Sequence, residues 1–438
     1  MSDRSIHIMK VIKNFVIAVL FVIAGFTNAE SNSQKVAESM RAFQQDDTQY
    51  ILIMRSPTDQ MNQAFPETFN EHVFKEVLDV FPADRDQTVR LGLGFIFSVF
   101  RSSDKSITQS LKNFLTVAQK LNVPVIVQID TECWWDYRPD LWNWWDPDKP
   151  GYNPANRDNV EWTGWSSRDA IKISWRNWGQ QLRVMPQPNL MSPGYLKECR
   201  EKINDYCKIV LDWYEQLPPS QKDLFVGIKV GHESSIGANS WYYPNGNDLL
   251  DKPEKDDPRT GLVDADVLSR GVTQIGYATL KTSGIRTSGD ITEADIAKVV
   301  QRYVSIISRA VGEAGVPREK LFTHGVGWKD GELLYDAAVN KYSCPGWSFY
   351  RHAGDPAKDE AVQRNLKRSD APYWAAVEWL YVSGPWTYEN WIKAIDNNLK
   401  LDKLKFICIF NWEVIMGHKD RDNVIKAIND VANGSAGK

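Results

Sequence analysis

The stretch VPVIVQIDTECWW, residues 123–135, joins an apolar run directly to acidic and aromatic side chains. Residues 123–129 show almost no alternation of apolar and polar positions, which is typical of a strand buried on both faces of a parallel sheet. Asp130 and Glu132 follow where such a strand would end, and Trp134 and Trp135 come soon after. The stretch therefore predicts a buried strand whose carboxyl end carries polar chemistry.

The same pattern recurs along the whole chain, with an amphipathic segment of helical period after most of the apolar runs. Alternation of this kind predicts a parallel sheet covered by helices. The predicted strands are residues 50–54, 90–100, 123–129, 224–230, 320–326, 344–350, 372–381 and 403–410. The predicted helices are residues 67–80, 105–121, 195–216, 291–314, 331–341, 356–368, 387–400 and 419–433.

Eight strands that alternate with helices predict an α/β fold of the (β/α)8 TIM-barrel class, in one domain over residues 48–438. An open doubly wound sheet is the alternative that this pattern leaves open. Two connections are long, residues 130–194 after the third strand and residues 231–290 after the fourth. Long connections in a compact domain usually form a functional site.

The chain begins with features of an export signal. Residues 1–29 combine a basic start, an apolar run and small residues at the end, as in a secretory signal peptide. Residues 30–47 form a polar lead-in. We therefore expect a secreted or periplasmic protein. The formal net charge of −4 and the lack of a basic face argue against nucleic acid as a partner, and we expect no stable membrane span.

The five cysteines are too few and too widely spaced for a disulfide framework. Cys199 and Cys207 lie eight residues apart on a predicted helix, too far to bond to each other. No Cys-x-x-Cys or His-x-x-x-His pair indicates a metal site. We therefore expect the cysteines to be small core residues, with their disulfide status left open, and we expect no metal and no cofactor.

Nine of the eighteen tryptophans lie between Trp134 and Trp178. Flat aromatic rings beside carboxylates at a strand end are suited to binding the apolar faces of sugars. The alternative is that the loop packs its own hydrophobic cluster, and some of the rings must do so. We expect roughly a third of them to face a ligand.

Glutamates at two other predicted strand ends are the candidates for catalysis. The fourth strand runs into His232 and Glu233, and the seventh strand carries Glu378 among apolar neighbours. A buried carboxylate needs a partner or a function. The alternatives are a salt bridge to a barrel arginine for Glu378 and a cap for Glu233. For Glu132 and Glu413 we expect the structural role.

This arrangement resembles the retaining glycoside hydrolases of the large (β/α)8 clan A. That resemblance implies Glu233 as the acid/base and Glu378 as the nucleophile. A tryptophan just after the eighth strand is also frequent there, which fits Trp412. Many clan members have asparagine before the acid/base, where this chain has His232.

Arginines follow four predicted strands: Arg55, Arg101, Arg138 and Arg351. Arginine is suited to paired bonds with carboxylate or sulfate, which indicates an anionic polysaccharide, uronate-bearing or sulfated, such as a sulfated fucan. The alternative is that each arginine neutralises a neighbouring carboxylate. The other predicted substrate-binding residues, besides the catalytic pair, are Trp134, Trp135, His232, Trp241, His324, Arg351, His352, Asn411 and Trp412.

The sequence thus predicts an exported glycoside hydrolase that degrades a polysaccharide or oligosaccharide, endo-acting and retaining. Two other classes stay open. A non-catalytic sugar-binding barrel would keep the tryptophans without the glutamate geometry, and a polysaccharide lyase would use His232, Tyr242 and the arginines at a uronate. A carboxyl separation of more than about 10 Å between Glu233 and Glu378 would exclude hydrolysis by this pair.

Overall fold

The computed structural model describes residues 48–178, 180–237, 240–262, 271–326 and 333–435. One compact unit spans Thr48–Lys438 and contains all of the elements described below. The signal peptide expected at residues 1–29 and the lead-in expected at residues 30–47 lie outside the described residues.

Eight parallel strands form the central sheet, in the order β8-β6-β3-β2-β1-β11-β10-β9. Parallel bridges from Phe322 to Cys344 and from Gly325 to Trp347 bring the two ends of this order together, so the sheet curves into a barrel. The strands are β1 (Tyr50–Arg55), β2 (Arg90–Ser98), β3 (Val125–Asp130), β6 (Phe225–Val230), β8 (Leu321–Thr323), β9 (Gly346–Phe349), β10 (Trp374–Trp379) and β11 (Leu404–Phe410). The predicted (β/α)8 class is confirmed, and the open doubly wound sheet is not formed.

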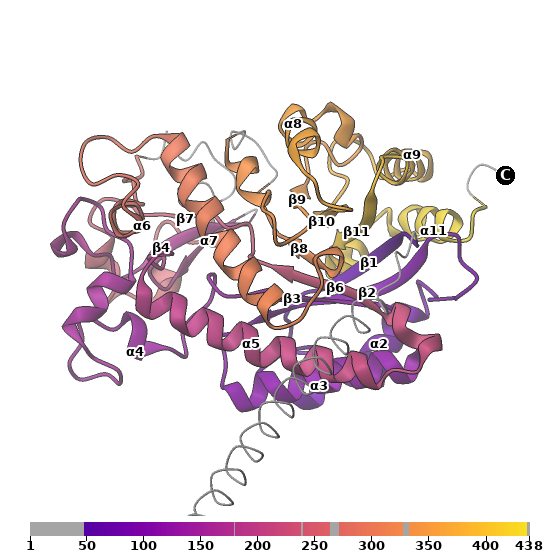
Figure 1. Ribbon diagram of the computed structural model, residues 1–438, viewed down its shortest axis with the longest axis horizontal. Coiled ribbons are helices and arrows are strands. Elements are labelled where there is room, and N and C mark those ends of the chain that lie inside the picture. Colours follow the sequence, from indigo (N-terminus) through magenta and orange to yellow (C-terminus); the bar gives the residue numbers. More distant parts are fainter. Residues whose placement is uncertain (1–47, 179, 238–239, 263–270, 327–332, 436–438) are drawn as a thin grey trace, which may run out of the picture. The chain divides into compact units, whose positions relative to one another are not determined.

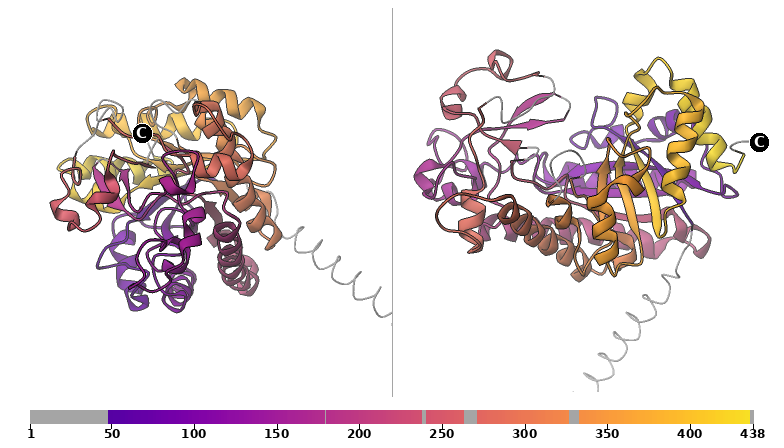
Figure 2. Two further views of the ribbon diagram at one scale, coloured as in Figure 1. Left: turned by 90° about the vertical axis from the view of Figure 1, so that its left-hand side faces the viewer. Right: turned by 90° about the horizontal axis from the view of Figure 1, so that it is seen from above.

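Helices cover the outside of the strands (Figures 1 and 2). The segment predicted as a helix at residues 331–341 is different: its described part holds a single 3-10 turn, η9 (Leu334–Ala338). The α-helices are α2 (Glu71–Leu78), α3 (Asp104–Leu121), α4 (Pro139–Trp142), α5 (Pro193–Gln216), α6 (Tyr277–Ser283), α7 (Glu293–Glu313), α8 (Glu360–Arg368), α9 (Tyr388–Leu399), α10 (Trp412–Gly417) and α11 (Arg421–Ala432).

Helix α3 illustrates why these segments fold as they do. Its N-cap Ser103 accepts a hydrogen bond from the backbone N–H of Ser106, and its C-cap Asn122 is left-handed. Ile107, Leu111 and Phe114 are buried on one face. This spacing of three and four residues lays an apolar stripe against the barrel. Capping satisfies the end groups that the helix cannot bond internally.

The barrel interior is filled by side chains and is no channel. Leu52, Ile126 and Phe406 belong to the buried apolar cluster there. Lys229 is also fully buried, and its ammonium donates a 2.8 Å hydrogen bond to the Val377 carbonyl. Burial lowers the pKa of Lys229. A packed interior leaves the carboxyl ends of the strands as the place for a site.

The two long connections build a second, small antiparallel sheet. Its strands are β4 (Ser174–Asn177) and β5 (Gln181–Val184) from the first connection and β7 (Ser240–Trp241) from the second. Glu161 also ties the connections together, since its carboxylate accepts backbone hydrogen bonds from Gly276 (2.9 Å) and Thr279 (3.1 Å). The two insertions therefore form one structural piece.

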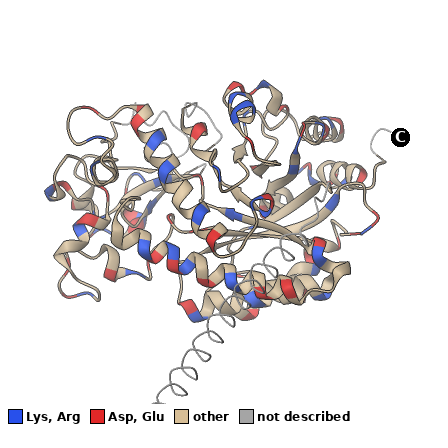
Figure 3. Cartoon of the chain, viewed as in Figure 1, with Lys and Arg blue, Asp and Glu red and all other residues tan. Residues whose placement is uncertain are grey.

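All five cysteines are buried, as predicted, and they are free thiols in this structure. Lysines and arginines are interspersed with acidic residues along the outer helices (Figure 3). Among the described residues, no helix is both long enough and apolar enough to span a bilayer.

Candidate active site

Glu233 is placed by a sharp turn after β6. Gly231 has a φ of 82° and Glu233 a φ of 52°, both in the left-handed region. Non-glycine residues adopt this conformation at an energetic cost, and such residues are concentrated at functional sites. The turn leaves Glu233 only 2% exposed and directs it to the pocket at the carboxyl end of the barrel.

Glu378 is placed by an irregularity in β10. The register between β10 and β9 shifts between Ala376 and Glu378. A bulge of this kind redirects a side chain, and bulges are frequent next to active sites. Glu378 is 5% exposed and lines the same pocket as Glu233.

The two glutamates meet in this pocket. One carboxylate oxygen of Glu233, one of Glu378 and a ring nitrogen of His324 all lie within 4.8 Å of one another. The pocket volume is about 510 Å³. Its lining residues are Ser56, Pro57, Ile96, Ser98, Arg101, Trp134, Asn177, Trp178, His232, Glu233, Tyr350, Glu378, Leu380, Phe410 and Val414.

Glu378 is held by Tyr350 and His324. The Tyr350 hydroxyl donates a hydrogen bond to Oε1 of Glu378, and Nε2 of His324 lies 3.6 Å from Oε2. The side-chain amide of Gln128 donates to Nδ1 of His324 at 3.0 Å. Nδ1 is therefore the acceptor and Nε2 carries the proton, which points toward Ser348 Oγ at 2.9 Å and toward Glu378.

His324 is a neutral donor. Burial, together with the positive charges of Lys229 and His232, holds its pKa well below the usual range. A neutral imidazole with its proton on Nε2 can hold the Glu378 carboxylate in one orientation. His324 is only 1% exposed and is not among the described residues that line the pocket. It therefore acts on the site through Glu378.

Glu233 has the protonation behaviour of an acid. Burial, with the negative charge of Glu378 beside it, raises the pKa of Glu233 to about 7. Ser348, His232 and Arg176 act in the opposite direction. Near neutral pH the site can therefore hold a protonated Glu233.

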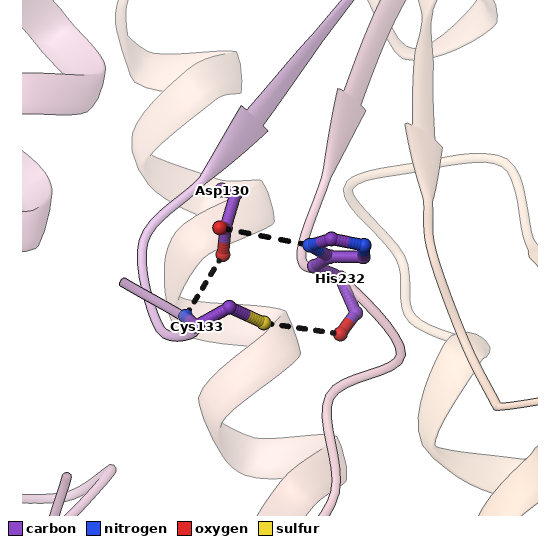
Figure 4. Close-up of side chains that lie close together, drawn as sticks. All are labelled: Asp130, Cys133 and His232. Carbon is purple, nitrogen blue, oxygen red and sulfur yellow. Dashed lines mark hydrogen bonds and ion pairs between the residues drawn. The ribbon is translucent and has the colours of Figure 1, made fainter. Parts of the chain in front are cut away.

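His232 is paired with Asp130 (Figure 4). Nδ1 of His232 lies 3.6 Å from Oδ2 of Asp130, which also accepts a 2.7 Å bond from Ser98 Oγ. Oδ1 accepts the backbone N–H groups of Glu132 and Cys133. Burial would raise the pKa of Asp130, but these donors and His232 hold it well below the usual range. Burial opposes charge on His232 too, yet Asp130 raises its pKa.

One wall of the pocket is a series of flat groups: Trp134 and Trp178 from the connection after β3, Arg101 from the loop after β2 and His232 from the turn after β6. The guanidinium of Arg101 lies 4.5 Å from the centre of a Trp134 ring. Trp134 meets Trp178 at 5.7 Å between ring centres, and Trp178 stacks on His232 at 5.2 Å with an angle of 16°. We call Arg101, Trp134, Trp178 and His232 the aromatic wall.

Two other predicted binding tryptophans are buried away from the pocket lining, Trp135 from the cluster and Trp241 from the second long connection. Trp135 is 1% exposed and donates to the Pro186 carbonyl. Trp241 is 2% exposed and pairs with Trp175 in the small sheet. Two of the nine rings, Trp134 and Trp178, are among the described residues that line the pocket, fewer than the expected third.

The remaining predicted binding residues also lie outside the described lining. Asn411 caps helix α10 and donates to Ser56 Oγ at 2.6 Å, and Trp412 packs edge-on against Phe81. After β9, Arg351 is exposed and His352 is half-buried. Asn411 and Trp412 therefore have structural contacts beside the site, and Arg351 and His352 lie outside its described lining.

Sequence reasoning missed Tyr350 as a site residue, although it ends the predicted strand at residues 344–350. Its position directly after a strand was the signal that could have found it. Asn177, Leu380 and Phe410 also line the pocket. Asn177 lies in β4, a strand that the sequence pattern did not predict.

The predicted arginine group divides. Arg55 is buried and pairs with Glu413 at 3.0 Å, and Arg138 pairs with Glu198 at 2.8 Å. These two arginines neutralise carboxylates, as the alternative expectation held. Arg101 is the member of the group that lines the pocket.

Two groups of donors have the spacing to hold a cation: Asp130, Cys133 and His232, and the group of Glu233, His324 and Glu378. In the first group, both oxygens of Asp130 already accept hydrogen bonds, and burial raises the pKa of the Cys133 thiol. A neutral thiol is a poor metal ligand. Hydrogen bonding and ion pairing account for the contacts that both groups make.

No protein-family model matches the chain, and no curated protein sequence matches it. Solved structures with a similar chain path include a glycoside hydrolase family 5 enzyme from Prevotella bryantii B14, at 9% identity and a TM-score of 0.39, covering 83% of this chain and 86% of that one. An alpha-amylase from Geobacillus thermoleovorans is 12% identical, with a TM-score of 0.37, and covers 89% and 78%.

A chitobiase from Flavobacterium johnsoniae is 11% identical, with a TM-score of 0.37, over 89% of this chain and 53% of that one. The Prevotella enzyme is a glycoside hydrolase by its own description. At these identities and TM-scores the likeness is a distant one of chain path alone.

Proposed function

We propose that this chain is a retaining glycoside hydrolase, with Glu233 as acid/base and Glu378 as nucleophile. The observation that carries the proposal is the approach of their carboxylate oxygens to within 4.8 Å. Retaining enzymes hold their two carboxyl groups about 5–5.5 Å apart, whereas inverting enzymes leave about 6.5–9.5 Å for a water molecule. The short separation supports retention.

The proposed reaction has two steps. Protonated Glu233 gives its proton to the glycosidic oxygen while a Glu378 oxygen bonds to the anomeric carbon and the carbon–oxygen bond to the leaving sugar breaks. In the second step a water molecule attacks the same carbon. Glu233, now ionised, takes a proton from this water, and the ester bond between the sugar and Glu378 breaks. Tyr350 and His324 orient Glu378 for attack.

We propose a polysaccharide as substrate, cut internally. The aromatic wall supports this because Trp134 and Trp178 offer two adjoining rings, which suit a chain of sugars. We also propose an anionic chain, uronate-bearing or sulfated, such as a sulfated fucan. Arg101, which lines the pocket, supports an anionic substrate. Arg55 and Arg138 do not support it, because they form salt bridges with Glu413 and Glu198.

The N-terminal segment supports export of the enzyme to the periplasm or outside the cell, where such polymers occur. A lyase has less support. Tyr242, one of the residues that a lyase would use at a uronate, accepts a hydrogen bond from the backbone N–H of Asn247 and lies outside the described pocket lining. A binding protein without catalysis would not need Glu233 and Glu378 brought together.

Glu233→Gln and Glu378→Gln test the proposal. Each variant keeps the size of the side chain but removes its acid–base or nucleophilic function, so each should lose at least about 100-fold in kcat with an unchanged circular dichroism spectrum. Glu389→Gln, at an exposed glutamate on α9, is the matched control.

Activity is to be measured on neutral, uronate-bearing and sulfated polysaccharides, with sizing of the products. Near-wild-type turnover by either variant would overturn the assignment of roles. Single sugars released from the start of the reaction would contradict internal cleavage. Products that absorb in the ultraviolet as unsaturated sugars would show a lyase.

A further inference from the structure

The aromatic wall has an arginine at one end and, at the other, a histidine beside the buried Asp130 carboxylate. Arg101 lies on the face of Trp134 at one end, and His232 stacks on Trp178 at the other. All four residues line the pocket that holds Glu233 and Glu378. We propose that this wall is a subsite for a negatively charged sugar chain, in which Arg101 binds a carboxylate or sulfate at one end of the wall and His232 donates a hydrogen bond to an anionic sugar at the other.

Arg101 is available for such a bond. It is exposed, and within the described part of the chain it makes no ion pair with a carboxylate, in contrast to Arg55 and Arg138. Its planar guanidinium can bond to two oxygens of a carboxylate or sulfate at once. Stacking on Trp134 limits the orientations it can take, which reduces the entropy lost on binding.

His232 is built as a fixed donor. Asp130 lies on its Nδ1 side, which leaves the other ring nitrogen on the opposite side of the ring (Figure 4). Trp178 covers one face of the imidazole, and His232 is 8% exposed. The buried Asp130 holds a proton on Nδ1, so Nε2 can donate toward the pocket.

The groups around His232 fit this role. Glu233 and Glu378 face it from β6 and β10 and, with Asp130, favour its charged form, while the buried Arg176 lies over Trp178. An anionic sugar would meet repulsion from the Glu378 carboxylate, and from Glu233 when that residue is ionised. Cations on the adjoining wall offset that repulsion and favour a charged substrate over a neutral one.

This inference deepens the proposed function, on which it rests for the identity of the ligand as a sugar. The test separates the two by measuring binding apart from hydrolysis. The protein used is the full-length chain carrying Glu378→Gln, so that bound sugars are not consumed.

The ligands are pairs that share a backbone and differ in charge. Polygalacturonate oligosaccharides and their methyl esters test carboxylate, and carrageenan and agarose oligosaccharides test sulfate. Isothermal titration should show at least about 10-fold tighter binding of the charged member of one pair. Arg101→Ala and His232→Gln should each reduce that preference by several-fold. Arg138→Ala, at an arginine already paired with Asp140 and Glu198, should leave it unchanged.

Equal affinity for both members of every pair, or no binding of any charged member, would overturn the subsite. A preference that survives both wall substitutions would overturn it as well. Failure of the proposed function looks different: charged oligosaccharides would bind through the wall, but the wild-type enzyme would not cleave them.

Discussion

Glu233, in the turn after β6, and Glu378, in β10, each bring a carboxylate oxygen to within 4.8 Å of the other. Two local irregularities achieve this: the left-handed turn at Glu233 and the register shift before Glu378. A regular strand end at either place would aim the side chain elsewhere. The backbone is thus shaped around this pair.

The pH dependence of kcat/KM should follow Glu233. Its pKa is raised to about 7, so the protonated acid is present below that pH and lost above it. Activity should therefore fall as the pH rises through about 7. His232→Asn removes a positive charge that favours ionised Glu233, and should move this fall to higher pH. A profile flat from pH 6 to 9 would contradict the assignment.

Tyr350→Phe should lower kcat. The hydroxyl donates to the Glu378 carboxylate, and a hydrogen bond to a charged group contributes about 1.5–3 kcal/mol, or roughly 10- to 100-fold in rate. KM should change much less. Steady-state kinetics check this, with Tyr152→Phe, at a half-exposed tyrosine outside the described pocket lining, as control. An unchanged kcat would remove Tyr350 from the mechanism.

Trp178→Ala and Trp241→Ala should separate binding from folding. Trp178 lines the pocket, so its loss should raise KM about 10-fold, equivalent to roughly 1.4 kcal/mol, with little effect on stability. Trp241 is buried in the small sheet, and its loss should cost about 3–5 kcal/mol of unfolding free energy. Kinetics and urea unfolding distinguish the two. The reverse pattern would show that the wall is structural.

Glu161→Ala should loosen the two long insertions. Its carboxylate accepts backbone N–H groups of Gly276, Ala278 and Thr279, which would be left buried without an acceptor. We expect a loss of about 2–3 kcal/mol in unfolding free energy. Hydrogen exchange should accelerate at Gly276, Ala278 and Thr279 more than in helix α3. Uniform acceleration across the barrel would argue against a local tie.

The barrel was predictable because buried parallel strands leave a strong mark on sequence. Residues 123–129 and 403–410 are largely apolar runs; β3 begins within the first and ends one residue past it, at Asp130, and β11 lies within the second. Helices such as α3 show their apolar stripe at regular spacing. Residues 331–341 have a helical period, yet the described part holds only the short turn η9, since periodicity alone does not ensure a long helix.

The site was predictable only where strand ends determine it. Glu233 and Glu378 follow from the barrel and from the rule that its chemistry lies at the carboxyl ends. The tryptophan cluster could not be divided into wall and core, because packing in the two insertions depends on long-range contacts such as Trp175 with Trp241. Composition does not encode such contacts. Trp134 and Trp178 are the same residue type as the other tryptophans of the cluster and differ from them only in lining the pocket.

The anomeric configuration of the first product tests the central claim most directly. Proton NMR during the first minutes of hydrolysis, before the sugar ring mutarotates, shows which anomer the enzyme releases. The proposed pair, with carboxylate oxygens within 4.8 Å of each other, predicts the same configuration as in the substrate, through an ester on Glu378. Release of the opposite anomer would contradict nucleophilic attack by Glu378 and the account built on it.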